Sequence, residues 1–123
     1  MFNKIINRGE VYSANLGDRS GSIQSGVRPV FIISNDINNK FSPTVNVLPI
    51  TSRTKNNIPV HVNIGFSEGL SQESTVLTEQ VVTINSNQLG DYIGKTSRHK
   101  MYEIEKAVML QNGIDKKSHS LAI

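Results

Sequence analysis

Short apolar runs separated by polar residues dominate the first two-thirds of the chain, and this pattern predicts a mainly β fold. The clearest run is 59–64, where Val60, Val62 and Ile64 alternate with other positions and are expected to face the interior. Gly, Pro, Asn and Ser separate the runs, as they do between the strands of a barrel or a curled sheet. The predicted strands cover residues 10–16, 27–33, 45–50, 59–64, 75–77 and 81–84.

Helical periodicity appears only late, between Arg98 and Asn112, where residues 101, 104, 107, 108 and 111 follow one another at steps of three and four. Thr96 or Ser97 can cap the start of this helix, and Gly113 provides its stop. Residues 17–26 contain three glycines and are predicted to form a loop, and 116–123 a loosely held tail. The polar residues 78–80 interrupt two apolar runs, as a bulge or a site would require.

The length of 123 residues suits one domain, residues 1–123, with a single core. The chain has no cysteine, which excludes disulfides, thiolate metal sites and cysteine nucleophiles. The first residues lack an apolar run long enough for a signal peptide, and no later stretch approaches the ~20 apolar residues of a membrane span. We therefore expect a soluble cytoplasmic protein without membrane association.

Charge is distributed unevenly along the chain. Residues 1–60 carry seven basic and three acidic groups, a net charge of +4, whereas the remainder carries six basic and seven acidic groups, a net charge of −1. Clustered Lys and Arg favour an anionic partner, because they can replace the counterions of phosphate groups. An ordinary solvated basic surface would give the same count, so charge alone does not identify nucleic acid.

Metal and nucleotide chemistry find little support in the sequence. His61, His99 and His119 are scattered and lack the spacing of metal ligands, so structural or surface roles are favoured for them. The glycines of the 17–26 loop do not open a predicted helix, and no Gly-Lys-Ser/Thr follows them, which argues against a phosphate-binding loop. We expect neither a metal nor another cofactor.

Two strings place a polar side chain beside a proline. Pro29 favours an extended backbone at Arg28, which enters its strand directly after the glycine-rich loop. Pro49 cannot donate to a β-ladder and indicates an edge or irregular position, with Thr51 near the end of the strand. From the residues alone, the favoured interpretation is that Arg28 is a surface charge and Thr51 a strand-end hydroxyl.

These strings stand in an order that resembles the MazF/PemK/Kid family of toxin endoribonucleases. The resemblance begins at Arg8-Gly9-Glu10-Val11-Tyr12 and continues through Gly26-Val27-Arg28-Pro29-Val30 to the late helix. Each string alone is weak, whereas their shared order with few gaps is specific. The other matching strings are Gly21-Ser22, Ser34-Asn35-Asp36, Ser42-Pro43-Thr44, Pro49-Ile50-Thr51-Ser52, Pro59-Val60-His61-Val62 and Leu77-Thr78-Glu79-Gln80.

The resemblance implies an α+β fold, mainly β with helices: a small SH3-like curled barrel with a C-terminal helix, assembled as a homodimer. It also implies a groove for single-stranded RNA, mainly mRNA, that the acidic extended C-terminal segment of a cognate antitoxin can occupy. The implied reaction is attack of a ribose 2′-hydroxyl on the adjacent phosphorus, leaving a 2′,3′-cyclic phosphate and a 5′-hydroxyl. No metal is required, because the nucleophile is already tethered beside its target.

Carried over by position, Arg28 matches the family's catalytic arginine and Thr51 its catalytic threonine. A guanidinium stays protonated and presents several donors, so it suits a phosphate clamp better than a base. Some relatives carry a carboxylate in the glycine-rich loop, whereas Ser22 and Ile23 follow Gly21 here, and the general base is therefore not assigned.

Sequence preference must come from polar groups that read unstacked base edges. The candidate RNA-binding residues are Ser22, Gln24, Ser52, Ser74, Glu79 and Gln80, together with Arg53 and Lys55 as partners for flanking phosphates.

Two rival functions remain open at this point. Small plasmid-type toxins of the same fold poison DNA gyrase without catalysis, but they depend on a C-terminal Trp-Gly-Ile, whereas this chain contains no tryptophan. The second rival is an RNA-binding module that has lost cleavage, for which the unassigned base is the only argument.

Overall fold

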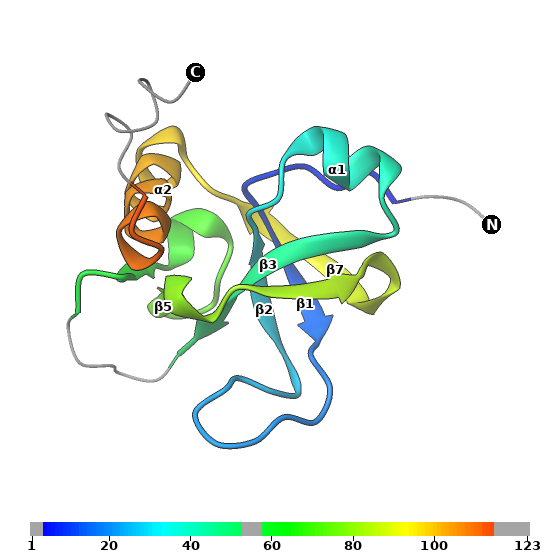
Figure 1. The fold of residues 1–123 in the computed structure, drawn as a ribbon, viewed down its shortest axis with the longest axis horizontal. Helices are drawn as coiled ribbons and strands as arrows, with labels where there is room; N and C mark the ends of the chain where they lie inside the picture. The colour runs from blue at the N-terminus through cyan, green and yellow to red at the C-terminus, as the bar shows by residue number, and fades with distance from the viewer. Residues whose placement is uncertain (1–3, 53–57, 115–123) are drawn as a thin grey trace.

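The computed structural model describes residues 4–52 and 58–114. These residues form an antiparallel sheet with one longer helix at its C-terminal end, arranged as in Figure 1. The predicted mainly β fold with a C-terminal helix is therefore confirmed. In chain order the elements are β1 (Glu10–Asn15), β2 (Val27–Ile32), α1 (Asp36–Phe41), β3 (Thr44–Thr51), β4 (His61–Ile64), η1 (Phe66–Glu68), β5 (Ser74–Leu77), η2 (Thr78–Gln80), β6 (Val82–Asn85), η3 (Ser86–Gln88), β7 (Leu89–Lys95) and α2 (Arg98–Gln111).

The strand order is β4-β5-β3-β2-β1-β7, and β6 also pairs with β3. On one side β3 pairs with β2. On its other side, residues 44–47 of β3 pair with β6, and Ile50 and Thr51 pair with β5. Pro49 lies between these two ladders. Its missing N–H therefore falls where β3 stops pairing with β6 and has not yet begun to pair with β5. The expected irregular position of Pro49 is confirmed, although β3 is a central strand rather than an edge.

Two hydrophobic clusters fill the two faces of the curled sheet. One contains Tyr12, Val30 and Val47, and the other contains Phe31, Leu48 and Ile104, which belongs to α2. The alternation along β2 and β3 distributes neighbouring residues to opposite clusters, as strand geometry requires. Val60, Val62 and Ile64 are buried, as predicted from their alternation.

Helix α2 covers one face of the sheet through Ile104 and Ala107. Its start is capped by Ser97, whose side chain accepts a hydrogen bond from the Lys100 N–H, and Gly113 follows its end with a φ of 67°. The predicted helix is therefore confirmed to within one residue, although Gln111 is exposed rather than part of the buried face. In the described ranges, no helix is long and apolar enough to cross a membrane.

Helix α1 and strand β7 are among the elements that the sequence patterns do not predict. Helix α1 is only six residues long and is capped by Asn35. Strand β7 pairs with β1 through two register shifts, and its exposed polar and glycine residues do not alternate with apolar ones. At its end, Gly94 packs so closely on the backbone of η1 that a Cβ there would collide with the Glu68 carbonyl. This contact holds the short η1 turn against the far edge of the sheet.

Candidate active site

Arg28 is the second residue of β2 and follows directly on the loop that joins β1 to β2. Its side chain is half-buried, and its Nε donates a hydrogen bond of 2.9 Å to the Ser25 carbonyl. This bond orients the guanidinium and uses only Nε. In the described part of the chain, no hydrogen bond engages the two Nη groups, and they can donate to a phosphate.

Thr51 is the last residue of β3, and only 3% of its surface is exposed. Val30 pairs with Pro49, so continuing the same register by two residues brings Arg28 opposite Thr51. Arg28 shares its face of β2 with Val30, and Thr51 shares its face of β3 with Val47, which belongs to the same hydrophobic cluster as Val30. By strand alternation, the two predicted catalytic residues thus project from the same face at the same end of the sheet.

A cavity of about 240 Å³ borders this end of the sheet. Two of the predicted RNA-binding residues, Ser52 and Ser74, line it together with Arg28. The Ser74 hydroxyl donates to the Gln72 carbonyl at 3.0 Å. Thr51 is not among the residues described as lining this cavity.

The loop residues form a second group, which is held together by Gln80. The Gln80 side chain accepts a hydrogen bond from the Gln24 N–H at 2.9 Å and donates one to the Ser22 carbonyl at 3.0 Å. Three of the predicted RNA-binding residues are therefore joined by hydrogen bonds. These bonds run from the Gln80 side chain to backbone groups of Ser22 and Gln24.

The comparisons with known proteins cover nearly the whole chain. The model of the family described as PemK-like, MazF-like toxin of type II toxin-antitoxin system matches residues 7–111. The chain belongs to this family. It is also 43% identical over 112 residues to the Endoribonuclease MazF of Staphylococcus saprophyticus, a match that covers 89% of this chain and 93% of that protein.

Solved structures of PemK/MazF-like proteins are similar to this chain throughout. An endoribonuclease in complex with its cognate antitoxin from a mycobacterial species is 29% identical and superposes with a TM-score of 0.76, covering 89% of this chain and 97% of that chain. MazF from Deinococcus radiodurans gives a TM-score of 0.78 over 90% of this chain and 99% of that chain. Its identity of 19% supports the shared fold alone.

One predicted RNA-binding residue of this PemK/MazF-like chain is engaged elsewhere. The Glu79 carboxylate lies 3.2 Å from Nε2 of His61, on the neighbouring strand β4. In the described part of the chain, neither His61 Nδ1 nor Glu79 Oε1, both buried, has a hydrogen-bond partner. The spacing of the histidines favours a structural or surface role for His61, and it does not predict the contact with Glu79.

Arg53 and Lys55 lie outside the described residues. Within the ranges that are described, no group of three or more His, Asp or Glu side chains is placed to hold a metal ion.

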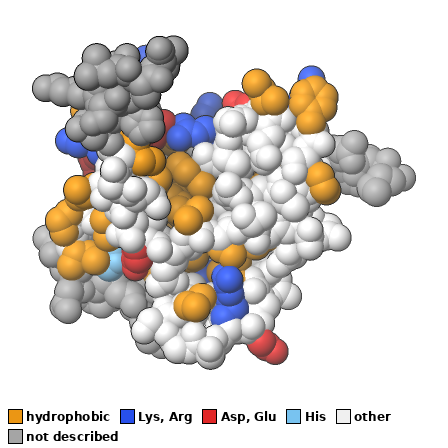
Figure 2. All heavy atoms as spheres, viewed as in Figure 1, with side chains coloured by type: hydrophobic (Ala, Val, Ile, Leu, Met, Phe, Trp, Pro, Cys, Tyr) orange, Lys and Arg blue, Asp and Glu red, His pale blue; other side chains and the backbone are white. Residues whose placement is uncertain are grey.

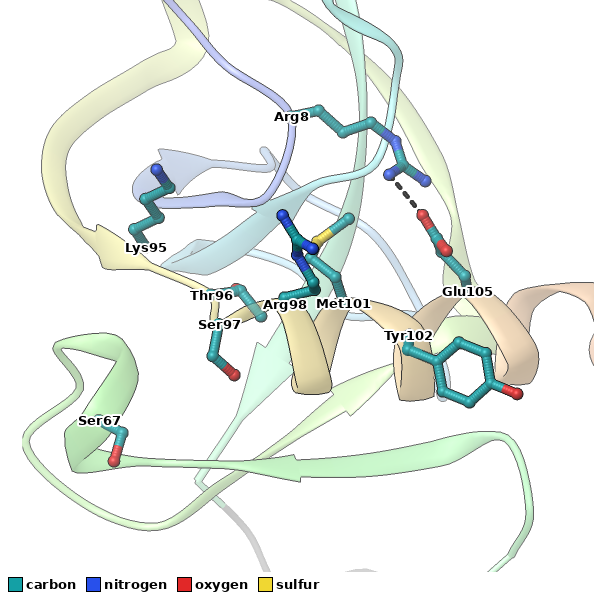
Figure 3. A pocket seen from close by; sticks show the side chains of 9 residues that line it. All are labelled: Arg8, Ser67, Lys95, Thr96, Ser97, Arg98, Met101, Tyr102 and Glu105. Carbon is teal, nitrogen blue, oxygen red and sulfur yellow. Dashed lines mark hydrogen bonds and ion pairs between the residues drawn. The ribbon is translucent and has the colours of Figure 1, made fainter.

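A larger cavity of about 730 Å³ lies at the start of α2, and no predicted site residue is among those described as lining it. Figure 3 shows Arg8, Lys95 and Arg98 around this cavity. The Arg8 guanidinium points to Glu105, with 2.6 Å between Nη1 and Oε2, so part of the positive charge is already neutralised. Arg28, the predicted catalytic arginine, lines the smaller cavity instead.

Proposed function

We propose that this chain is the toxin of a type II toxin–antitoxin system that cleaves single-stranded RNA, mainly mRNA, and thereby inhibits translation and growth. The observation that carries the proposal is the 43% identity to an Endoribonuclease MazF over 89% of the chain. The family match over residues 7–111 includes Arg28, Thr51 and Gln80, and residues 1–123 are interpreted as one toxin domain.

In the proposed reaction, the ribose 2′-oxygen forms a bond to phosphorus while the bond from phosphorus to the 5′-oxygen breaks. The proton leaves the 2′-hydroxyl, and the departing 5′-oxygen gains one, which yields a 2′,3′-cyclic phosphate and a 5′-hydroxyl. The Nη groups of Arg28 donate to the phosphate oxygens and stabilise the charge that develops there. Thr51, at the same end of the sheet, binds the same phosphate. No residue is assigned as the general base.

The reaction is proposed to proceed without a metal, because the 2′-hydroxyl is tethered next to the phosphorus that it attacks. An oriented guanidinium supplies positive charge where a metal-dependent nuclease would use a cation. The bases flanking the cleaved bond are proposed to contact a set of polar side chains. These are Ser22, Gln24, Ser52, Ser74, Glu79 and Gln80, with Arg53 and Lys55 contacting flanking phosphates.

The proposed partner is a cognate antitoxin whose acidic, extended C-terminal segment occupies the RNA groove. The similar mycobacterial endoribonuclease, which is in complex with its cognate antitoxin, supports a partner of this kind. An acidic segment would compete with RNA for Arg28, because both ligands present oxyanions to the same donors. The site of action is proposed to be the cytoplasm, where mRNA is translated.

The active form is proposed to be a homodimer. An apolar groove of about 510 Å³ lies between β4 and α2, with Val62, Ala107 and the exposed Leu110 among its lining residues. Figure 2 shows hydrophobic side chains gathered over this side of the molecule, where Figure 1 places α2. Light scattering should give twice the mass of one chain, and a monomeric mass at micromolar concentration would contradict the dimer.

The function is tested by incubating the purified protein with single-stranded RNA in EDTA and identifying the new ends. We expect cyclic phosphate and 5′-hydroxyl ends at a short recurring sequence. Activity that EDTA abolishes and magnesium restores would contradict the proposed chemistry. Inhibition of DNA gyrase without RNA cleavage would favour the gyrase-poisoning class, and RNA binding without either effect would favour a non-catalytic module.

A further inference from the structure

The cavity lined by Arg28 combines apolar walls with a few polar groups, as pockets for small organic rings do. Pro29, Ile50 and Leu70 supply apolar wall, and the last two belong to the buried core. The volume of about 240 Å³ lies below the roughly 300–1,000 Å³ of pockets for drug-sized ligands, so the cavity suits a single ring system. Because a base lies one sugar away from its phosphate, a base in this cavity can belong to a nucleotide that flanks the phosphate bound by Arg28.

Four residues besides Arg28 bring polar side chains to this cavity: Ser52, Ser71, Gln72 and Ser74. The Ser74 hydroxyl already donates to the Gln72 carbonyl at 3.0 Å. Ser52 and Ser71 each present one hydroxyl, which can donate or accept and therefore distinguishes base edges poorly. The Gln72 side chain presents a donor and an acceptor side by side, so it can make two hydrogen bonds to one base edge.

The backbone around Gln72 is restrained, whereas its side chain is free. Before Gln72, the Leu70 N–H donates to the Gly65 carbonyl at 3.2 Å, and the Leu70 side chain is buried. After it, Ser74 pairs with Ile64 of β4, and the Ser74 hydroxyl holds the Gln72 carbonyl. In the described part of the chain, no hydrogen bond engages the Gln72 side-chain amide. A free amide on a restrained backbone can bind a base without first ordering its loop.

We propose that Gln72 is a specificity-determining residue, whose side-chain amide binds the edge of one base next to the scissile phosphate. The proposal rests on the proposed function of Arg28, and it adds a residue that the sequence motifs do not indicate. Gln80, which the sequence motifs do indicate, already bonds to the Gln24 N–H and the Ser22 carbonyl. A base that used the same atoms of Gln80 would have to displace the loop, whereas a base at Gln72 displaces nothing.

The first experiment maps the cleavage sites in a pool of RNA of random sequence. Gln72→Ala removes the amide, and Gln72→Glu replaces its N–H donors by a second acceptor. Gln111→Ala is the matched control, because Gln111 is an exposed glutamine at the end of α2. The Gln72 side chain is exposed, so each variant should unfold cooperatively within a few degrees of the wild type.

In Gln72→Ala we expect the preference for one base, at one position beside the cut, to fall by about 5- to 150-fold, which is the discrimination that one two-bond contact supplies. Preferences at the other positions, and the whole profile of Gln111→Ala, should be unchanged. Gln72→Glu should shift the same position toward guanine, because the Watson–Crick edge of guanine offers two neighbouring N–H donors to a carboxylate. An unchanged site profile in Gln72→Ala, or an equal change at every position, would overturn the proposal.

The second experiment follows binding without cleavage. The wild type is titrated with a mixed-sequence pool of short single-stranded oligodeoxynucleotides, which lack the attacking 2′-hydroxyl. NMR follows the Arg28 Nε–H and the side-chain amides of Gln72 and Gln111. We expect the Arg28 and Gln72 signals to shift together while the Gln111 signal stays unchanged.

A shift at Arg28 with none at Gln72 would overturn the proposal, since the nucleic acid would then occupy the site without contacting the amide. Absence of RNA cleavage by the wild type would contradict the proposed function. The titration would still test whether Gln72 contacts a base, so the two failures are distinguishable.

Discussion

Replacing Arg28 by alanine is the most direct test of the proposed chemistry. The substitution removes two Nη donors from the proposed phosphate site and the Nε bond to Ser25. Loss of one preorganised donor to a developing oxyanion costs on the order of 10²- to 10³-fold in rate, and a two-donor clamp more. We therefore expect cleavage by Arg28→Ala to fall by at least ~10²-fold.

The cost in stability is expected to be much smaller. Arg28 is half-buried rather than fully exposed, and its one hydrogen bond to Ser25 has a net value of about 1 kcal/mol. For a chain of this size, such a change lowers Tm by roughly 3–6 °C. Arg28→Ala should therefore remain folded at assay temperature, which allows loss of activity to be separated from unfolding.

Lysine at this position should restore little activity. Its ammonium group is a point charge, which cannot reproduce the planar fork by which the Arg28 guanidinium bonds the Ser25 carbonyl through Nε and leaves two Nη groups for a phosphate. Arg98→Ala is the matched control, because Arg98 is an exposed arginine in the first turn of α2, away from β2.

The assay compares initial cleavage rates and thermal unfolding for Arg28→Ala, Arg28→Lys, Thr51→Ala and Arg98→Ala. A rate for Arg28→Ala within tenfold of the wild type would refute the catalytic assignment. The same conclusion would follow if Arg28→Ala lost activity only at temperatures where it unfolds.

Three further results are expected. RNA affinity of a catalytically inactive variant should fall with salt, with a logarithmic slope of about −2 for three phosphate contacts, and a slope of zero would refute the charge argument. Gly94→Ala should destabilise the fold by about 1–3 kcal/mol in urea titration, because its methyl group collides with the Glu68 carbonyl, whereas a Cβ at Gly90 meets nothing closer than 3.5 Å; equal effects at both glycines would contradict this reasoning. Burial raises the pKa of the Tyr12 phenol above its ordinary value of 10.0, so the stability contributed by the neutral phenol is present below pH 10.0 and lost above it. Titrations at pH 9 and 11 should show a larger loss for the wild type than for Tyr12→Phe.

The spacing of apolar residues predicted those strands and helices in which the pattern is contained within the element itself. The alternation at Val60, Val62 and Ile64 located β4, although the strand begins at His61, and the three-to-four spacing around Ile104 located α2. Strand β7 has no such signal, because Gly90, Asp91 and exposed Tyr92 interrupt any alternation. Its extended conformation depends on pairing with β1, a contact between residues about 80 positions apart.

The candidate site likewise has a part that the sequence predicts and a part that it does not. The order of motifs indicated Arg28 and Thr51, and strand alternation then explains why they share a face. The contacts of Gln80 and Glu79 were not predictable from the sequence, because Gln80 bonds to residues 56 and 58 positions away and Glu79 to one 18 positions away. Glu79 and Gln80, which are adjacent in one short motif, thus bond to different residues, and only folding brings those residues close to them.

The divided pairing of β3 also sets the time at which the site can form during synthesis. Thr51 leaves the ribosome early, but the strands that flank β3 on the side away from β2 are β5 and β6, which end at Leu77 and Asn85. Until those residues have emerged, one edge of β3 has no partner, and Gln80 cannot reach the loop. A nascent chain from which Asn85 has not yet emerged therefore lacks the complete sheet, and a ribosome translating this message is not exposed to a finished nuclease until most of the chain has been made.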